Sequence, residues 1–391
     1  MPANPNITHP LQRLGHLSLT PGLRELAPDP AQSGLAVTAT VAVPGTPVSR
    51  GTAWEVAWAD AAREAERLGA DPDTAKAVER GAGTAEAGGT RVVVAAHGQV
   101  VLAWWLPAGT GVSSVRVGPL PHLLEVADAA ARRPAHVVLL VDRAGADIVA
   151  HPAGDQVPGL QLEPGNRPGE QHDPHPGRPP ALHHGERHLT DSEPESGGQL
   201  NADFIAARVA EAADSAGAHV ILGAGDQHIL DAVAGHLAET IGPVTAIAGG
   251  RAADGRDDHL TAEISAALDA VTGAAVSAVG DLVSSAAEEA SPAAVRGIKD
   301  VAEQLAEQQV AVLLVAADAA QDGAQGTVYR IGSRPTEFLA GDSGPGVEVP
   351  LDDGLVWAAV HQDAIVVQVP DRSGPLAGEP AAALLRRGVA R

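Results

Sequence analysis

The sequence predicts an α/β protein, because runs rich in β-branched residues alternate with helical stretches in three regions of the chain. A chain of 391 residues is also too long for one ordinary domain. The pattern changes near residues 133 and 275, so we expect three α/β domains over residues 1–133, 134–275 and 276–391. Because only 2% of the residues are aromatic, their cores should be built from small side chains.

The first region opens with a predicted strand over residues 35–43. Residues 52–69 predict an amphipathic helix that places Trp54, Trp58 and Leu68 near one face. Residues 91–107 predict a hairpin that turns at His97-Gly98. A helix follows, and Pro134 ends it.

The second region begins with a predicted hairpin over residues 135–152. Residues 153–198 are dense in Gly, Pro and His and lack apolar periodicity, which predicts a long loop that is functional or disordered. Regular structure resumes near Asn201 with a helix that should turn Phe204, Ile205 and Val209 inward. The strand, helix and strand that follow up to residue 250 predict a βαβ-like unit.

The third region is preceded by a helical stretch over residues 257–309, with breaks expected at Gly273, Gly280 and Pro292. Residues 310–318 and 327–332 then predict strands. Residues 356–369 predict a final hairpin around Gln362-Asp363, and the run AAALLRR predicts a closing helix. Together these elements predict a small α/β/α sandwich.

Composition excludes several classes of protein. The chain has no cysteine, which rules out disulfides, thiol nucleophiles and Cys-based metal sites. No signal peptide and no unbroken apolar run of membrane length are evident, so we expect a cytoplasmic protein without a membrane partner. The net charge of −23 disfavours general binding to DNA or RNA, so an RNA contact would have to be local and based on arginine. No cofactor is expected.

Four segments resemble the bacterial archaeo-eukaryotic release factor family two. This family is related to eukaryotic class-one release factors, Pelota, the Vms-type peptidyl-tRNA hydrolases and the hibernation factor Balon. The segments are RRPAHVVLLVDRAGADIV, NADFIAARVAEAADSAGAHVILGAG, ASPAAVRGIKDVAEQLAEQQVAVLLVAAD and LDDGLVWAAVHQDAIVVQV. The resemblance runs from about residue 35 to residue 369. It implies an RNase H-like central domain and a third domain like the ribosomal-protein-like domain of release factors.

The resemblance gives meaning to the triplet Gly197-Gly198-Gln199, which precedes the predicted helix near Asn201. In release factors a GGQ loop at this place promotes hydrolysis of peptidyl-tRNA. Two glycines permit close approach to a crowded substrate, and a glutamine amide can orient a water molecule or stabilise an oxyanion. The resemblance therefore implies these three residues as candidate catalytic residues.

The surroundings of the triplet depart from the family pattern. Carboxylates flank it where release factors carry basic residues: Asp191, Glu193, Glu195 and Asp203. The first region also lacks a NIKS-like decoding element, so reading of stop codons is unsupported. A polar loop that contains the triplet by accident is the alternative interpretation.

Histidines and arginines gather in the same predicted loop. The stretch EQHDPHPGRPPALHHGERH contains His172, His175, His183, His184 and His188. Its spacing matches no defined metal motif, although such a density of imidazoles can bind metal. Partly protonated histidines together with arginines could instead supply local positive charge. The expected RNA contacts are Arg167, Arg178, His183, His184, Arg187 and His188.

Two weaker candidate sites lie elsewhere. The turn at Gly223, Gly225 and Asp226 opens a predicted helix and could hold a phosphate, although ordinary turn chemistry explains it equally. The stretch RAADGRDDHL groups acidic residues that could bind Mg²⁺ or form a capped acidic loop.

Three functions remain open. The first is a tRNA-mimicking, ribosome-binding protein of hibernation or rescue, with ribosomal RNA at the tRNA site as its partner and an elongation factor or translational GTPase as a further candidate. The second is a peptidyl-tRNA hydrolase that uses Gln199. The third is a stress-associated protein that binds metal through the His-rich loop.

Overall fold

The computed structural model divides into two compact units. Unit 1 comprises Met1–Leu11, His16–Ala131 and Val276–Arg391, and unit 2 comprises Gln12–Gly15 and Arg132–Ala275. The structure describes residues 10–17, 21–26, 35–42, 50–83, 89–106, 113–142, 145–153, 187–190, 202–238, 241–250, 258–289, 291–319, 329–332, 338–340 and 346–387. The predicted division of unit 1 into an N-terminal and a C-terminal domain stays a prediction.

Unit 2 is built around a mixed sheet in the order β7-β6-β5-β8-β9. The second strand in sequence, β6, is antiparallel to β5 and β7, whereas β8 and β9 run parallel to β5. This order, with the second strand alone reversed, is that of RNase H-like sheets. The strands are β5 (His136–Asp142), β6 (Gly145–His151), β7 (Arg187–Thr190), β8 (Val220–Gly225) and β9 (Val244–Ala246).

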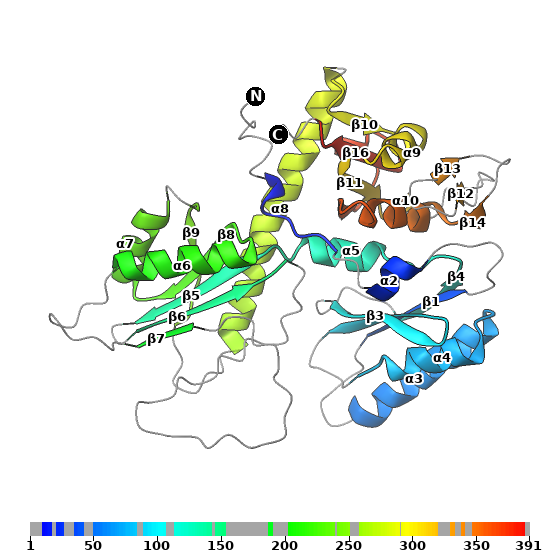
Figure 1. Cartoon of the computed structure of the whole chain (residues 1–391), viewed down its shortest axis with the longest axis horizontal. Helices are drawn as coiled ribbons and strands as arrows, with labels where there is room; N and C mark the ends of the chain where they lie inside the picture. Colours follow the sequence, from blue (N-terminus) through cyan, green and yellow to red (C-terminus); the bar gives the residue numbers. More distant parts are fainter. Residues whose placement is uncertain are drawn as a thin grey trace. The chain divides into compact units, whose positions relative to one another are not determined.

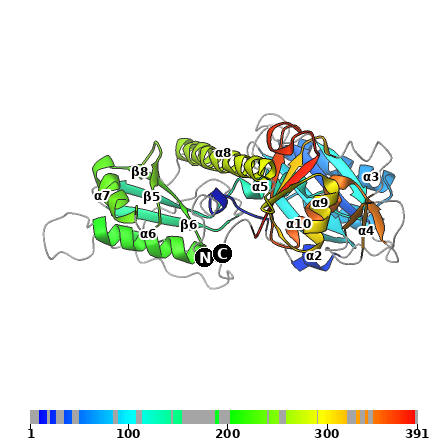
Figure 2. The same cartoon turned by 90° about the horizontal axis from the view of Figure 1, so that it is seen from above.

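Helices cover both faces of this sheet (Figures 1 and 2). The helices are α6 (Ala202–Ala216), α7 (Gln227–Leu237) and α8 (Asp258–Glu288). Residues of β5 alternate between the faces: Leu139 packs with α6 and α7, whereas Leu140 packs with α8. The α/β class is therefore confirmed, with an apolar core on each side of the sheet.

The N-terminal region of unit 1 holds an antiparallel sheet in the order β3-β2-β1-β4. Trp54 and Trp58 are buried on one face, where Trp105 stacks on Trp54 at 5.7 Å between ring centroids. The elements are α2 (Pro21–Glu25), β1 (Ala36–Ala42), α3 (Arg50–Arg67), α4 (Pro72–Arg80), β2 (Thr90–Ala96), β3 (Gln99–Leu106), β4 (Ser114–Gly118) and α5 (Leu124–Ala131).

The C-terminal region of unit 1 holds a mixed sheet in the order β10-β16-β11-β15, in which β11 and β15 are parallel. A small antiparallel sheet has the order β13-β12-β14. The elements are β10 (Ala294–Arg296), α9 (Ile298–Ala306), β11 (Val310–Ala316), β12 (Tyr329–Ile331), β13 (Phe338–Ala340), β14 (Val347–Val349), α10 (Leu351–Val360), β15 (Ile365–Val369), η3 (Gly374–Leu376) and β16 (Ala381–Leu385).

The two regions of unit 1 are in direct contact. Helix α5 of the N-terminal region packs on β15 and α10 of the C-terminal region. The backbone N–H of Gln368 in β15 also donates to Asp128 Oδ1 of α5 at 2.9 Å. Helix α5 thus belongs to the packing of both regions.

Two predicted C-terminal elements are wrong. The expected hairpin over residues 356–369 is instead the end of helix α10 followed by strand β15, and the expected closing helix is strand β16. Helix α10 is buried along its whole length, so its residues show no helical periodicity. Strand β16 lies between β10 and β11, and backbone pairing on both sides outweighs the helix propensity of its Ala and Leu residues.

Three local expectations also fail. Helix α8 continues through Gly273 and Gly280, because its other residues sustain the hydrogen bonds that a single glycine merely weakens. Phe204 is 52% exposed, whereas its neighbour Ile205 is buried as expected. The predicted loop over residues 153–198 contains strand β7, whose pairing with β6 is a long-range effect.

One helix of the described residues, His259–Glu288, is long and apolar enough to cross a bilayer by length and composition, with a mean hydropathy of 1.4 in its most apolar window. Leu260, Ile264 and Leu268 of this helix pack against β5 and β8 in unit 2. This part of the helix is therefore a core helix of unit 2.

Candidate functional site

The structure describes two of the residues that the sequence predicts for the central site. Arg187 and His188 lie in β7, where their backbones pair with Ile148 and Asp147 of β6. Helix α6 is the next described element along the chain. Outside the described residues lie Gly197, Gly198, Gln199, Arg167, Arg178, His183 and His184, together with His172 and His175.

The turn between β8 and α7 shows ordinary turn chemistry. Asp226 caps α7 by accepting the N–H of His228 at 3.0 Å, so a carboxylate already lies where an anion would bind. Gly225 has a φ of +117°, and a Cβ there would lie 1.8 Å from the carbonyl oxygen of Val141. The glycine therefore serves the close approach of β8 to β5.

The acidic stretch RAADGRDDHL stays a candidate Mg²⁺ site by sequence alone. Residues 251–257 lie outside the described residues, and Asp258 begins helix α8. His259 is exposed on the first turn of that helix.

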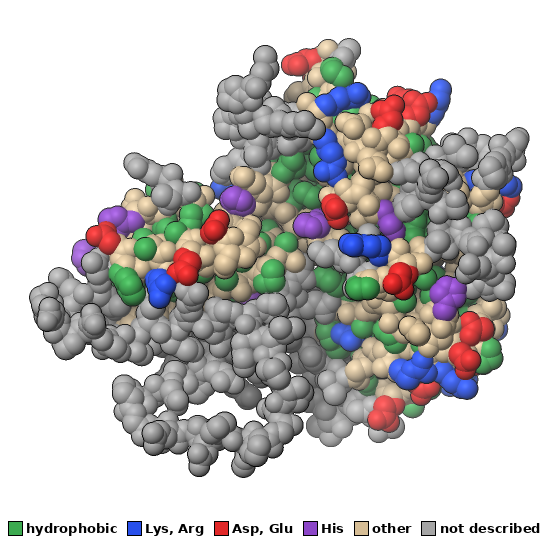
Figure 3. Space-filling view, in the orientation of Figure 1, with side chains coloured by type: hydrophobic (Ala, Val, Ile, Leu, Met, Phe, Trp, Pro, Cys, Tyr) green, Lys and Arg blue, Asp and Glu red, His purple; other side chains and the backbone are tan. Residues whose placement is uncertain are grey.

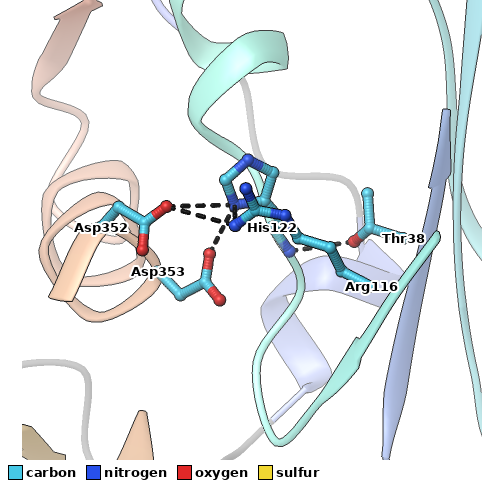
Figure 4. Close-up of polar contacts among 5 residues, drawn as sticks. All are labelled: Thr38, Arg116, His122, Asp352 and Asp353. Atoms are coloured by element: carbon cyan, nitrogen blue, oxygen red, sulfur yellow. Dashed lines mark hydrogen bonds and ion pairs between the residues drawn. The ribbon is translucent and has the colours of Figure 1, made fainter. Parts of the chain in front are cut away.

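A buried polar cluster in unit 1 is the constellation that the structure adds. We call His122, Asp352 and Asp353 the His-Asp cluster. His122 precedes helix α5, and both aspartates lie in the first turn of helix α10 (Figure 4). All three residues are buried. The first N–H groups of a helix have no hydrogen-bond partner within the helix, so carboxylates are favoured at this place.

The N-terminal sheet positions His122. Thr38 of β1 and Arg116 of β4 are direct cross-strand partners, so their side chains share one face of the sheet. The backbone N–H of His122 donates to Thr38 Oγ1 at 2.9 Å, and Arg116 Nη1 lies 3.1 Å from His122 Nδ1 (Figure 4). Thus two neighbouring strands hold the residue from both its backbone and its ring.

The two aspartates converge on the same ring nitrogen. His122 Nδ1 lies 2.7 Å from Asp353 Oδ1 and 3.5 Å from Asp352 Oδ2. Arg116 Nη1 lies 3.4 Å from Asp352 Oδ2. Burial raises the pKa of Asp353 above its ordinary value of 3.8, while the hydrogen bond with His122 opposes this change. The cluster can therefore hold a proton or a cation between two segments of the chain.

Sequence reasoning missed the His-Asp cluster because its members are far apart along the chain. His122 and Asp353 are separated by 231 positions, and no motif links them. One local signal was available: Pro350 followed by Leu351, Asp352 and Asp353 has the acidic first turn typical of a helix start. That signal would have corrected the predicted hairpin but not found the histidine.

The segment that carries the sheet of unit 2 is release-factor-like. Residues 135–289 match the family model Bacterial archaeo-eukaryotic release factor family 2. This match confirms the predicted resemblance for residues 135–289, which include strands β5 to β9 and helices α6 to α8. No curated protein matches the chain.

Solved structures show distant similarity. Archaeoglobus fulgidus Pelota is 14% identical, with 76% of this chain and 79% of that chain covered and a TM-score of 0.33. Dom34 of S. cerevisiae, a translation termination-like factor interacting with Hbs1, is 8% identical, with 74% of each chain covered and a TM-score of 0.37. A model of ribosome-bound archaeal Pelota and ABCE1 is 14% identical, with 96% and 97% covered and a TM-score of 0.38.

Proposed function

We propose that this chain is a release-factor-like, ribosome-binding protein of the cytoplasm that acts in translation. The match of residues 135–289 to the release factor family carries the proposal. The sheet of unit 2 supports it, because its order is that of the RNase H-like domain expected for the family. Occupation of the tRNA site would by itself exclude tRNA, so a role in hibernation or rescue requires no chemistry.

The acidity of the chain limits how it can approach ribosomal RNA. Its net charge is −23. On the face shown in Figure 3, the Lys and Arg side chains of the described residues lie scattered among Asp and Glu. A local basic contact is therefore needed. The proposed contacts are Arg167, Arg178, His183, His184, Arg187 and His188, and a delivering elongation factor or translational GTPase is a further proposed partner.

Co-sedimentation with ribosomes tests this function. The parent protein should pellet with ribosomes at about 50 mM salt and leave them as the salt rises to about 200 mM, because release of counterions drives contacts of arginine with phosphate. The double variant Arg167→Ala, Arg178→Ala should bind more weakly. The matched control is Arg63→Ala, Arg67→Ala, which removes two exposed arginines that pair with Asp60 and Glu64 on α3. A parent protein that stays in the supernatant at low salt would contradict the proposal.

Peptidyl-tRNA hydrolysis is the second candidate function, because Gly197-Gly198-Gln199 lies within the segment that matches the family. In this proposal the glycines allow the backbone to approach the ester. The Gln199 amide then orients the attacking water.

Release of peptide from a defined peptidyl-tRNA complex on the ribosome tests this candidate. Gln199→Ala should slow release by roughly 100-fold, the usual cost of losing one positioned donor. Gln171→Ala changes another glutamine of the same predicted loop and should leave the rate unchanged. Equal rates for the parent and Gln199→Ala would end the catalytic assignment and leave ribosome binding untouched.

A further inference from the structure

We propose that the His-Asp cluster of unit 1 binds a divalent transition-metal cation, with Zn²⁺ as the reference ion. His122, Asp352 and Asp353 each offer one ligand atom, and these atoms lie within 4.8 Å of one another. Two ligand atoms bonded to one zinc ion at about 2.1 Å in tetrahedral geometry are about 3.4 Å apart. Side-chain movements of under about one ångström would therefore close the three atoms around an ion.

A buried oxygen of Asp352 is a second observation that supports a bound cation. Asp352 is 2% exposed, and its side chain is directed at His122 (Figure 4). Among the described residues, its Oδ1 atom is buried and has no hydrogen-bond partner. A buried carboxylate oxygen is rarely left unsatisfied, because the loss of its hydration is costly. A bound cation would satisfy it.

The contacts around His122 Nδ1 also favour a cation. Arg116 Nη1 at 3.1 Å can only donate a hydrogen bond, whereas an ionised Asp353 at 2.7 Å can only accept one. One nitrogen cannot be the acceptor for the first and the donor to the second in the same tautomer. A metal ion bonded to Nδ1 and to both carboxylates removes this conflict, and the side chain of Arg116, 48% exposed, can turn towards solvent.

The ligand chemistry selects the class of ion. One imidazole nitrogen with carboxylate oxygens suits Zn²⁺, Mn²⁺ or Fe²⁺, whereas Mg²⁺ and Ca²⁺ prefer oxygen alone. The residues are 9%, 2% and 6% exposed in the order His122, Asp352 and Asp353, so the cluster is largely shielded from solvent. Such an ion would fasten the N-terminal region of unit 1 to its C-terminal region.

Calorimetric titration of the full chain with Zn²⁺, and separately with Mn²⁺, tests the proposal. The protein is purified without an affinity tag and stripped with a chelator. It carries His183→Ala and His184→Ala, so that the predicted His-rich loop binds less metal. The expected result is one Zn²⁺ per chain and a raised thermal midpoint. X-ray absorption at the zinc edge should show a single imidazole among oxygen ligands.

Three variants in this background identify the ligands. Asp352→Asn and His122→Gln should each weaken binding by about 100-fold or more, beyond the roughly 10–100-fold effect of changes around a metal site. Asp371→Asn removes an exposed carboxylate of the same unit that accepts from Ser373, and it should bind as the parent does.

Arg116→Gln separates a metal site from an ion-pair cluster. Loss of the guanidinium removes a competing positive charge, so Zn²⁺ should bind at least as tightly as in the parent. If the cluster were only an ion pair of Arg116 with the aspartates, this variant would bind no metal and would lose stability. The proposal is overturned if the parent takes up no stoichiometric metal, or if Asp352→Asn and His122→Gln retain the affinity of the parent.

Discussion

Successive side chains of a strand point to opposite faces of its sheet, and the two faces differ in polarity between the central sheet of unit 2 and the N-terminal sheet of unit 1. In β5 of the central sheet, Leu139 and Leu140 face opposite sides, and both sides are apolar. In β1 of the N-terminal sheet, Val37 and Ala39 face the apolar side with α3 and α4, whereas Thr38 faces the side of Arg116. Thr38 is nevertheless buried, at 3% exposure.

This difference shows how each sheet is held to its neighbours. Burial of apolar area has no preferred direction, so the central sheet can accept helices on both faces without specific contacts. A buried threonine needs a partner, and Thr38 finds it in the backbone of His122. The polar face of the N-terminal sheet therefore specifies where the chain before α5 lies, and with it the His-Asp cluster.

Gly225→Ala should have the largest effect, because the added Cβ would meet the carbonyl of Val141 and the backbone φ is unfavourable for alanine. We expect a loss of about 4 kcal/mol or more in the free energy of unfolding. Chemical denaturation followed by circular dichroism measures it, and hydrogen exchange locates the loss in β5 and β8.

A glycine in α7 supplies the control. A Cβ at Gly235 would have no described atom within 4 Å, so Gly235→Ala should stabilise the protein by about 1 kcal/mol. The same chemical change at Gly225 and at Gly235 should thus shift the free energy of unfolding in opposite directions. Similar effects for both would contradict the close approach of β8 to β5.

Leu140→Ala tests the apolar side of the central sheet that faces α8. The leucine is fully buried among Leu222, Leu260 and Ile264. Removing its side chain should cost about 2–5 kcal/mol through lost burial and the cavity left behind. Hydrogen exchange should quicken in β5 and in the first turns of α8, and unchanged exchange there would exclude this packing.

Thr38→Val tests the polar face with a smaller expected effect. Valine has nearly the shape of threonine but cannot accept the N–H of His122, which would then be buried without a partner. The cost should be about 1–3 kcal/mol by chemical denaturation. The matched control is Thr40→Val, which changes the neighbouring buried threonine on the same face of β1. A neutral Thr38→Val would mean that the hydrogen bond to His122 does not specify the position of the chain before α5.

His361 gives the smallest effect, which depends on pH. Burial lowers the pKa of His361 below its ordinary value of 6.5, and Arg24 adds to this, whereas the Trp357 carbonyl and Asp363 act in the opposite direction. Below pH 6.5 the unfolded chain therefore takes up a proton that the folded chain resists, so stability falls as the pH falls. Above this pH the residue is neutral in both states and contributes no pH dependence.

His361→Asn tests this dependence, because an asparagine amide can still donate to the Trp357 carbonyl but does not titrate. Denaturation at a series of pH values should show a shallower loss of stability on acidification than in the parent. Parallel curves for the two proteins would show that His361 does not contribute.

Local patterns predicted unit 2 well. An apolar periodicity or a turn signal within a few residues marks each of its predicted elements: the hairpin β5–β6, helices α6 and α7, and strands β8 and β9. Strand β7 escaped prediction because four residues are too few to show a period, and its pairing with β6 is decided by the sheet. The class of fold follows from repetition of such local signals.

Elements buried on all sides could not be predicted. Every residue of helix α10 and of strand β16 is buried, so neither the helical period nor the alternation of a strand appears in their sequences. The candidate catalytic triplet was found as a motif because its residues are adjacent, whereas the His-Asp cluster joins residues more than 200 positions apart. Folding alone brings the latter together, which a single sequence does not reveal.

The placement of tryptophan provides a built-in optical probe. All five tryptophans of the chain, Trp54, Trp58, Trp104, Trp105 and Trp357, belong to unit 1, and the segments of unit 2 contain none. Intrinsic fluorescence excited at the indole band therefore reports on unit 1 alone. Spectroscopy can thus follow events in unit 1 without a label, because unit 2 contributes no tryptophan fluorescence.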